Sequence, residues 1–300
     1  MVKKIYMAGC GGMLGEAFYK IFSSNYLLKC SDIDVNDNWL SYLDFRDYDK
    51  YKKSVFEFKP DYLFHIGAFT DLEYCEKNPD NTKITNTDSV KHAVSIANDL
   101  DISILYISTA GIFDGSKDTF DESDQPNPIG HYAKSKYEAE VYVQNFSKKH
   151  LICRAGWMMG GGPKKDKKFI QKIIQQIKDG KKEIFVVDDK LGTPTYTIDF
   201  AKNVKLMIEN NVFGLFNLVC EGLTSRLDVA KELISILRLE QDINIKSVNS
   251  SYFKKEYFAE RPSSERLINT KIKSMNLHIM RDWRHCLNEY INEYYKDYIK

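Results

Sequence analysis

A hydroxyl, a phenol and an ammonium group in the middle of the chain have the types and spacing of a proton-transfer site. Thr109 follows an apolar run at residues 102–107, and Tyr132 and Lys136 lie four residues apart in a stretch with helical periodicity, so both project from one helix face. A phenol has a pKa of about 10, and a nearby ammonium group lowers it toward neutrality. Thr109 can orient a carbonyl oxygen beside the phenol. The trio predicts hydride transfer to a ketone, with Tyr132 protonating the oxygen.

The N-terminal segment predicts a binding site for the cofactor that such a reaction needs. Residues 4–8 are typical of a short buried strand, glycines follow at positions 9, 12 and 15, and helical periodicity begins at Leu14. In this context Gly9 makes a tight turn, Gly12 lets the backbone approach a pyrophosphate and Gly15 lets helix and strand pack closely. Glycine spacing alone also fits a plain turn. The position of the glycines between a strand and a helix favours a nicotinamide dinucleotide whose pyrophosphate faces the helix N-terminus.

Asp32 bears on which nicotinamide cofactor is used. It ends the second predicted strand, at residues 26–31. An acid about twenty residues beyond the glycines can hydrogen-bond the adenosine ribose and repel a 2′-phosphate. Asp32 therefore favours NADH over NADPH, although an acidic loop residue after a strand is the alternative interpretation.

Strands and helices alternate over the first half of the chain, which predicts an α/β fold of the Rossmann type with a doubly wound parallel sheet. Residues 62–66 and 102–107 are typical strands, and a long helical region at 79–100 separates them. We expect residues 1–157 to form the NAD(P)-binding domain, with a later segment at about 184–212 returning to it. Residues 158–300 are then mainly a smaller C-terminal α/β substrate-binding lobe.

The composition excludes several classes of partner. The chain has 43 Lys and Arg against 42 Asp and Glu, and this near-neutral balance gives no reason to expect nucleic acid or an acidic membrane. The six cysteines are scattered, with no CxxC pair, as expected in a reducing compartment. No apolar run is long enough for a signal segment or a membrane span. We therefore expect a cytoplasmic protein.

A series of motifs in this order resembles the extended short-chain dehydrogenase/reductases, and within them the dTDP-4-dehydrorhamnose reductase family. The resemblance covers nearly the whole chain. The motifs are residues 9–15, Lys59-Pro60-Asp61, Ala68-Phe69-Thr70, Ser108-Thr109 with Phe113-Asp114-Gly115, residues 132–136, Arg154-Ala155-Gly156-Trp157, residues 189–195, and Arg261-Pro262 through Arg266-Leu267.

The resemblance implies reduction of the 4-keto group of a nucleotide-linked 6-deoxyhexose by NADH or NADPH, as in the synthesis of dTDP-rhamnose for polysaccharides. It implies catalytic roles for Thr109, Tyr132 and Lys136. The implied cofactor-binding residues are Gly9, Gly12, Met13, Leu14, Gly15, Asp32, Asp44, Phe45, Gly67, Ala68, Phe69, Tyr132 and Lys136. The implied substrate-binding residues are Thr109, Ala110, Trp157 and Arg261, although an arginine at position 261 also fits a salt bridge at the rim.

Two departures from the family pattern affect substrate and metal. The family usually has Asp-Tyr directly after the catalytic threonine, where this chain has Ala110-Gly111, so the sugar or its configuration can differ. Some members hold a divalent metal through glutamates at a dimer contact. One such position is Ala17 here, so we expect no metal. The chain is expected to be a monomer or a homodimer.

Three other functions are alternatives to this one. A reductase or epimerase/reductase acting on a UDP- or GDP-linked sugar has the same requirements. A non-catalytic subunit similar to the regulatory β subunit of methionine adenosyltransferase shares the fold, and the intact Thr109, Tyr132 and Lys136 argue against it. A 4,6-dehydratase needs an additional acid and base, which Ala110-Gly111 does not supply.

Overall fold

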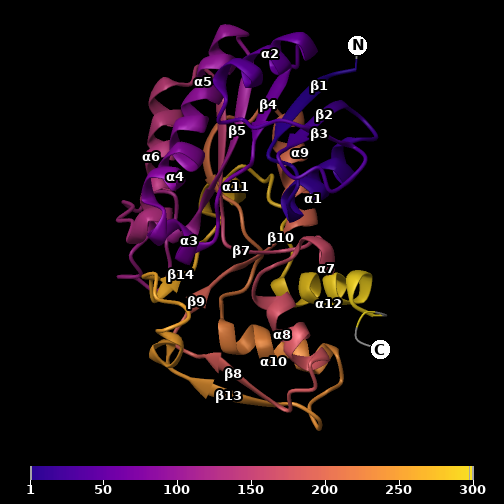
Figure 1. Cartoon of the computed structure of the whole chain (residues 1–300), viewed down its shortest axis with the longest axis vertical. Coiled ribbons are helices and arrows are strands. Elements are labelled where there is room, and N and C mark those ends of the chain that lie inside the picture. Colours follow the sequence, from indigo (N-terminus) through magenta and orange to yellow (C-terminus); the bar gives the residue numbers. More distant parts are fainter. Residues whose placement is uncertain (1, 297, 299–300) are drawn as a thin grey trace.

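The centre of the molecule is a seven-stranded sheet in which every neighbouring pair of strands runs parallel. The computed structural model describes residues 2–296 and 298. The strands follow the order β11-β6-β5-β4-β1-β2-β3 (Figure 1). Their bounds are β1 Lys4–Ala8, β2 Leu27–Asp32, β3 Leu40–Tyr42, β4 Tyr62–His65, β5 Ser103–Thr109, β6 His150–Ala155 and β11 Gly214–Asn217. The doubly wound fold expected from the sequence is confirmed.

Helices cover both faces of the sheet because successive strand residues point to opposite sides. In β1, Ile5 and Met7 join one apolar cluster, and Tyr6 and Ala8 join the other. The first cluster includes side chains from α1 Met13–Phe22 and α9 Thr197–Glu209. The second includes side chains from α2 Tyr48–Phe58, α5 Ser89–Asp99 and α6 Gly130–Phe146.

The helical region expected at 79–100 is divided into several pieces. Asp71 caps a short helix, α3 Leu72–Lys77, by accepting a hydrogen bond from Tyr74 N at 2.8 Å. Pro79 then begins α4 Pro79–Lys83 at its first position, where the missing N–H costs nothing. A π-helical turn, Ile84–Asp88, joins α4 to α5. Such turns often mark functional positions.

The sheet has a switch point between β1 and β4, which are hydrogen-bonded neighbours. The chain proceeds from β1 to β2 and β3 on one side, and from β4 to β5 and β6 on the other. Ligands of such sheets bind beyond the carboxyl ends of the strands at this point. Gly9 and Gly67 follow β1 and β4 there.

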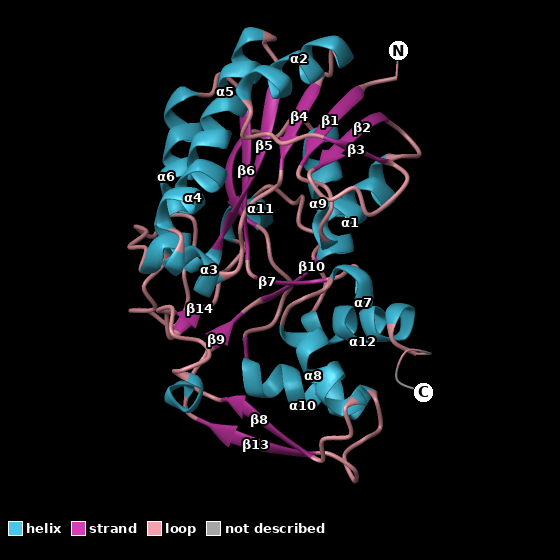
Figure 2. Cartoon of the chain, viewed as in Figure 1, coloured by secondary structure: helices cyan, strands magenta, loops and turns pink. Residues whose placement is uncertain are grey.

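The smaller lobe lies beyond the carboxyl ends of the sheet (Figure 2). Its elements are α8 Phe169–Lys178, β8 Glu183–Val187, α10 Arg226–Ile236 and β13 Asn244–Val248. β8 and β13 pair in parallel, apart from the main sheet. Ser225 and Asp228 form a capping box at the start of α10, which satisfies otherwise unpaired N–H groups.

Short strands connect the two parts. β7 Trp157–Met159 pairs with β10 Pro194–Tyr196, and a second small sheet contains β9 Leu191–Gly192, β12 Thr224–Ser225 and β14 Ser264–Glu265. The remaining helices are α7 Gly162–Lys165, α11 Thr270–Ser274 and α12 Trp283–Tyr294, with 3-10 turns at Ala110–Ile112 and Ser250–Phe253. The segment at 184–212, expected to return to the first domain, is divided between the two parts. β8 pairs with β13 outside the main sheet, whereas α9 packs on α1 against the sheet. The domain boundary at residue 157 stays a prediction.

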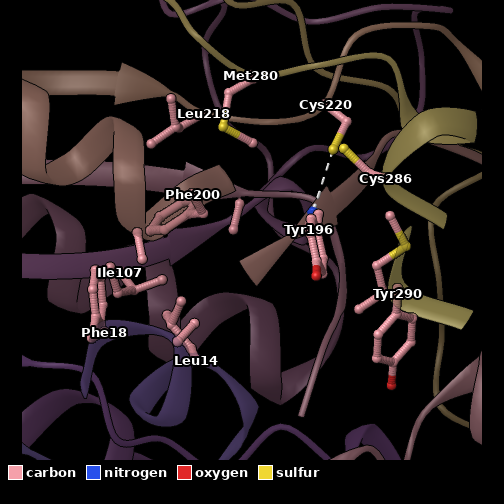
Figure 3. Packing of buried hydrophobic residues seen from close by; sticks show 14 of the residues in the cluster. Leu14, Phe18, Ile107, Tyr196, Phe200, Leu218, Cys220, Met280, Cys286 and Tyr290 are labelled. Carbon is pink, nitrogen blue, oxygen red and sulfur yellow. Dashed lines mark hydrogen bonds between the residues drawn. The ribbon is translucent and has the colours of Figure 1, made fainter. Parts of the chain in front are cut away.

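One continuous apolar core joins the sheet to the C-terminal part of the chain. Figure 3 shows Phe18 and Phe200 near Ile107, and Cys220 beside Cys286 of α12. The six cysteines are free and buried. In the part of the chain that the structure describes, no helix is both long and apolar enough to cross a membrane.

Candidate active site

Thr109 is the last residue of β5, at the carboxyl end of the sheet. Its Oγ1 accepts a hydrogen bond from Gly111 N at 3.1 Å, which begins the 3-10 turn Ala110–Ile112. An extended backbone at Thr109, followed at once by this turn, directs the chain away from the sheet. The hydroxyl accepts this backbone hydrogen bond and can still donate one of its own.

Tyr132 and Lys136 lie in the first two turns of α6. Gly130 has a φ of +73°, a conformation that suits glycine. The helix then begins with the His131 N–H donating to Glu76 Oε1 at 2.6 Å. Tyr106 OH, on β5, donates to Lys136 O at 3.0 Å and ties the helix to the sheet. The Lys136 ammonium lies 4.2 Å from the centroid of the Tyr106 ring.

Burial governs the protonation of both residues. Burial raises the pKa of Tyr132 to about 12, and the Thr109 hydroxyl opposes this rise. Burial also lowers the pKa of Lys136 to about 7, and Glu140 opposes that change. The expectation that Lys136 lowers the pKa of Tyr132 is therefore wrong in this structure, because desolvation disfavours the charged form of each group. The phenol holds its proton at neutral pH.

Asn86 connects the loop after β4 to the helix that carries Tyr132. It is fully buried in the π-helical turn. Its Oδ1 accepts from Phe69 N at 2.8 Å, and its Nδ2 donates to Phe69 O at 3.0 Å and to Ser135 Oγ at 3.1 Å. Ser135 Oγ in turn donates to Tyr132 O at 2.7 Å. Nothing in the sequence marks Asn86, because its neighbours come from two distant segments.

The glycine turn has the close contacts expected of it. Gly9 has a φ of +83°, and a Cβ on it would lie 2.1 Å from Gly67 Cα. A Cβ on Gly15 would lie 2.1 Å from Cys10 O, so α1 packs directly on the turn. Phe45 covers Gly67, where an added Cβ would meet its ring at 2.4 Å. Larger residues at these three glycines would force the backbone segments apart.

The N-terminus of α1 has the features of an anion site. Gly12 precedes the helix and provides no side-chain cap, so first-turn N–H groups remain for a ligand. Met13 and Leu14 are the first two helical residues. Asp32, at the end of β2, accepts a hydrogen bond from Gly11 N at 2.7 Å and another from Asp34 N at 2.9 Å. Its carboxylate is therefore held beside the glycine turn.

Two predicted site residues have partners within the protein. Asp44 forms an ion pair with Arg46 at 2.6 Å. Arg261 forms an ion pair with Glu73 at 2.8 Å. This contact fits a salt bridge at the rim, which the sequence analysis gave as the alternative to a substrate contact.

Ala110 is only 1% exposed and packs in a small apolar cluster with Phe113 and other residues, so its methyl group faces protein. Ala68 lies between Gly67 and Phe69 in the loop that Asn86 holds.

His65 has the structural role expected for a histidine within an apolar run. It is buried in β4, with Nδ1 3.2 Å from Tyr51 OH and Nε2 3.1 Å from Ser89 Oγ. Burial, and to a smaller extent the charge of Lys136, lower its pKa to about 3. His65 is therefore neutral in the folded protein.

Trp157 brings two unpredicted residues to the site. Its Nε1 donates to Glu265 Oε2 at 2.7 Å. The Arg226 guanidinium lies 3.7 Å from the centroid of its ring and 4.8 Å from that of Phe169. Burial lowers the pKa of Arg226 to about 10, and it remains a cation at neutral pH. Glu265 lies in the connecting strand β14 and Arg226 begins α10 of the smaller lobe, so sequence spacing did not connect them with Trp157.

Comparison with known proteins identifies the family. The model of the RmlD substrate binding domain matches residues 3–296. The chain belongs to this family. Among RmlD relatives, the spore coat polysaccharide biosynthesis protein SpsK of Bacillus subtilis is 25% identical over 291 residues, covering 97% of each chain.

Solved structures agree with the RmlD assignment. The dTDP-4-dehydrorhamnose reductase of Yersinia enterocolitica is 30% identical and superposes with a TM-score of 0.85, covering 97% of this chain and 99% of that one. The Bacillus anthracis dTDP-4-dehydrorhamnose reductase, solved in complex with NADP, has a TM-score of 0.89, covering 98% and 100%; at 24% identity it supports the fold alone. The resemblance inferred from the motifs is confirmed at the level of the family.

Proposed function

We propose that this RmlD-family chain catalyses the NAD(P)H-dependent reduction of the 4-keto group of a nucleotide-linked 6-deoxyhexose, as in dTDP-rhamnose synthesis. One observation carries the proposal. Tyr132, protonated at neutral pH, and the Thr109 hydroxyl meet at the carboxyl edge of the sheet, where the uncapped start of α1 also lies. A proton donor beside an anion site at the switch point suits carbonyl reduction by a dinucleotide.

The residues at the switch point fit a nicotinamide dinucleotide. A Cβ on Gly12 would meet nothing within 4 Å, so the space outside the turn is open to a pyrophosphate. The N–H groups of the first turn of α1 would bind its oxygens. When bound, the reduced nicotinamide supplies a hydride to the carbonyl carbon.

Three side chains of the protein act in the rest of the carbonyl reduction. As the carbonyl oxygen gains negative charge, the Tyr132 hydroxyl donates its proton and the carbonyl becomes an alcohol. The Thr109 hydroxyl donates a hydrogen bond to the same oxygen and orients it. Lys136, in its ammonium form, would donate hydrogen bonds to the cofactor's ribose hydroxyls and so position the nicotinamide.

Asp32 supports a preference for NADH. Its carboxylate, fixed by Gly11 N and Asp34 N, lies where the adenosine ribose of a dinucleotide on α1 would come. A 2′-phosphate would bring like charges together, and the ribose hydroxyls would instead donate to the carboxylate.

The proposed substrate site lies between Thr109 and the smaller lobe. Trp157 offers an aromatic face, and the buried Arg226 guanidinium against it supplies a positive charge suited to a diphosphate. The name of the SpsK relative connects this family with polysaccharide synthesis, which fits a sugar-nucleotide substrate.

A substrate panel tests the function. NADH oxidation should be followed with dTDP-, UDP- and GDP-linked 4-keto-6-deoxyhexoses, and with NADPH in parallel. We expect stoichiometric oxidation with at least one of them, with dTDP-4-dehydrorhamnose the first to examine. Oxidation with none would favour a binding subunit and overturn the proposal.

A further inference from the structure

Glu265 brings a carboxylate to the catalytic threonine from the far end of the sequence. It lies in β14, which pairs in parallel with β9 so that Glu265 is opposite Gly192. A Cβ on Gly111 would lie 3.2 Å from Glu265 Oε1 and 3.5 Å from Thr109 Oγ1. The carboxylate and the threonine hydroxyl therefore flank the same small residue. A larger side chain at position 111 would occupy the place of the carboxylate.

Trp157 orients this carboxylate. The indole Nε1 donates to Glu265 Oε2 at 2.7 Å. The ring is itself fixed, because the Gly192 backbone lies against it, where an added Cβ would come within 2.2 Å of Cε2. Arg226 lies against the ring as well, at 3.7 Å from the centroid. Figure 2 shows β7, β9 and β14 together at the junction between the sheet and the smaller lobe.

The second oxygen of Glu265 is available to a ligand. Within residues 2–296 and 298, the only hydrogen bond to this carboxylate comes from Trp157 and reaches Oε2. Oε1 points toward Gly111 and Thr109, the side on which a reacting carbonyl would bind. The negative charge of Glu265 also reaches Tyr132, where it contributes to the raised pKa of the phenol. Glu265 thus lies beside Thr109, and its charge reaches Tyr132.

An ionised carboxylate only accepts hydrogen bonds, and a sugar ring offers hydroxyl donors beside a carbonyl carbon. Ala110 is buried and Gly111 has no side chain, so neither residue after Thr109 provides an acceptor of this kind. We propose that Glu265 Oε1 accepts a hydrogen bond from a sugar hydroxyl next to the carbonyl that is reduced, and thereby selects sugars that carry this hydroxyl. The inference rests on the proposed function, since it assumes a keto-sugar substrate.

The test compares Glu265→Gln with the wild type on three substrates. One is the 4-keto-6-deoxy sugar nucleotide that the wild type reduces best, and the other two are its 2-deoxy and 3-deoxy analogues. Glutamine keeps the size of the side chain and can still accept from Trp157, but it loses the charge that strengthens the ligand's hydrogen bond. We expect kcat/KM for the hydroxylated substrate to fall roughly 10- to 100-fold, mainly through KM. We expect little change for the 3-deoxy analogue, because the hydroxyl on carbon 3 is the one next to the carbonyl, and a loss like that of the parent sugar for the 2-deoxy analogue.

Glu260→Gln is the matched control, because Glu260 is exposed and lies five residues before Glu265. It should leave kcat/KM within about twofold on every substrate, as surface substitutions usually do. Glu265→Ala, with its folding checked by thermal melting, should repeat the selectivity of Glu265→Gln with a larger loss.

The outcomes separate this inference from the proposed function. If the wild type reduces no 4-keto sugar nucleotide, the proposed function fails. If the wild type is active but Glu265→Gln loses activity equally on the parent sugar and on both analogues, Glu265 only positions Trp157 and the inference is wrong. Unchanged kcat/KM in Glu265→Gln would also overturn it.

Discussion

Tyr132 and Lys136 lie one turn apart on α6, and burial shifts the pKa values of their side chains in opposite directions. The pKa of Tyr132 rises to about 12, and that of Lys136 falls to about 7. The phenol is therefore a protonated donor at neutral pH, while the lysine is close to half protonated. This difference suits an enzyme that delivers a proton to a carbonyl oxygen.

Tyr132→Phe removes the proposed proton donor and should lower kcat by about 10²- to 10⁴-fold. The ring stays in place, so NADH binding, followed by fluorescence, should change little. Tyr137→Phe is the control on the same helix, because its hydroxyl contacts only Gln125 at 3.1 Å among the described residues. Equal activity in the two variants would refute a catalytic role for Tyr132.

The pH profile of reduction should report Lys136. Its ammonium form is present below a pKa of about 7, so kcat/KM for reduction should fall as the pH rises through neutrality. Lys136→Met should be far less active, and its residual rate should lack this fall. A wild-type profile that is flat between pH 6 and 9 would show that the ammonium group is not required.

The substitution Lys136→Met should also stabilise the fold. In the folded protein the pKa of Lys136 is about 7 against an ordinary 10.5, so between these values the unfolded chain binds more protons. Stability therefore increases as the pH rises from 7 toward 10. Lys136→Met removes the buried cation and should raise the free energy of unfolding at pH 7 by roughly 1–4 kcal/mol. Urea unfolding of both proteins at pH 7 and pH 10 measures this; a less stable variant at pH 7 would contradict it.

Asn86→Ala should weaken both the fold and cofactor binding. The substitution leaves the Phe69 backbone groups and Ser135 Oγ without their buried partner. We expect a loss of about 1–3 kcal/mol in the free energy of unfolding and an increased Kd for NADH. Asn81→Ala, which removes one hydrogen bond to Tyr74 OH, is the control. Should both variants bind NADH as the wild type does, Asn86 would have no role in shaping the cofactor site.

Asp32→Asn should shift the cofactor preference. Asparagine can still accept from Gly11 N, but the charge that repels a 2′-phosphate is gone. The ratio of kcat/KM for NADPH over NADH should rise roughly 10-fold, as expected for loss of one nearby charge. Asp34→Asn should leave the ratio nearly unchanged. A constant ratio in Asp32→Asn would mean that another group sets the preference.

Most of the fold around the sheet could be predicted because its apolar residues repeat at strand or helix spacing. The strands predicted at residues 62–66 and 102–107 correspond to β4 Tyr62–His65 and β5 Ser103–Thr109. The region at 79–100 differs because the π-helical turn Ile84–Asp88 separates α4 from α5 within it. Short strands such as β13 Asn244–Val248 are partly exposed and polar, so their sequence carries little periodic signal.

The candidate site was predictable only where one segment contains its chemistry. The glycine turn and the Tyr132–Lys136 pair each lie within a single strand–turn–helix or helix. Glu265 and Arg226 reach the site through strand pairing and stacking between distant segments, which spacing along the chain does not show. The pKa of Tyr132 differs from the sequence-based expectation for a related reason, because burial depends on the tertiary packing around α6.

Transfer of a labelled hydride tests the central proposal most directly. The protein should be incubated with dTDP-4-dehydrorhamnose and NADH carrying two deuterium atoms at C4 of the nicotinamide. The account predicts a product that is heavier by one deuterium, located at carbon 4 of the sugar, and formed far more slowly by Tyr132→Phe. If no deuterium reaches the sugar, or if Tyr132→Phe transfers it at the wild-type rate, the proposed reaction or its proposed proton donor is wrong.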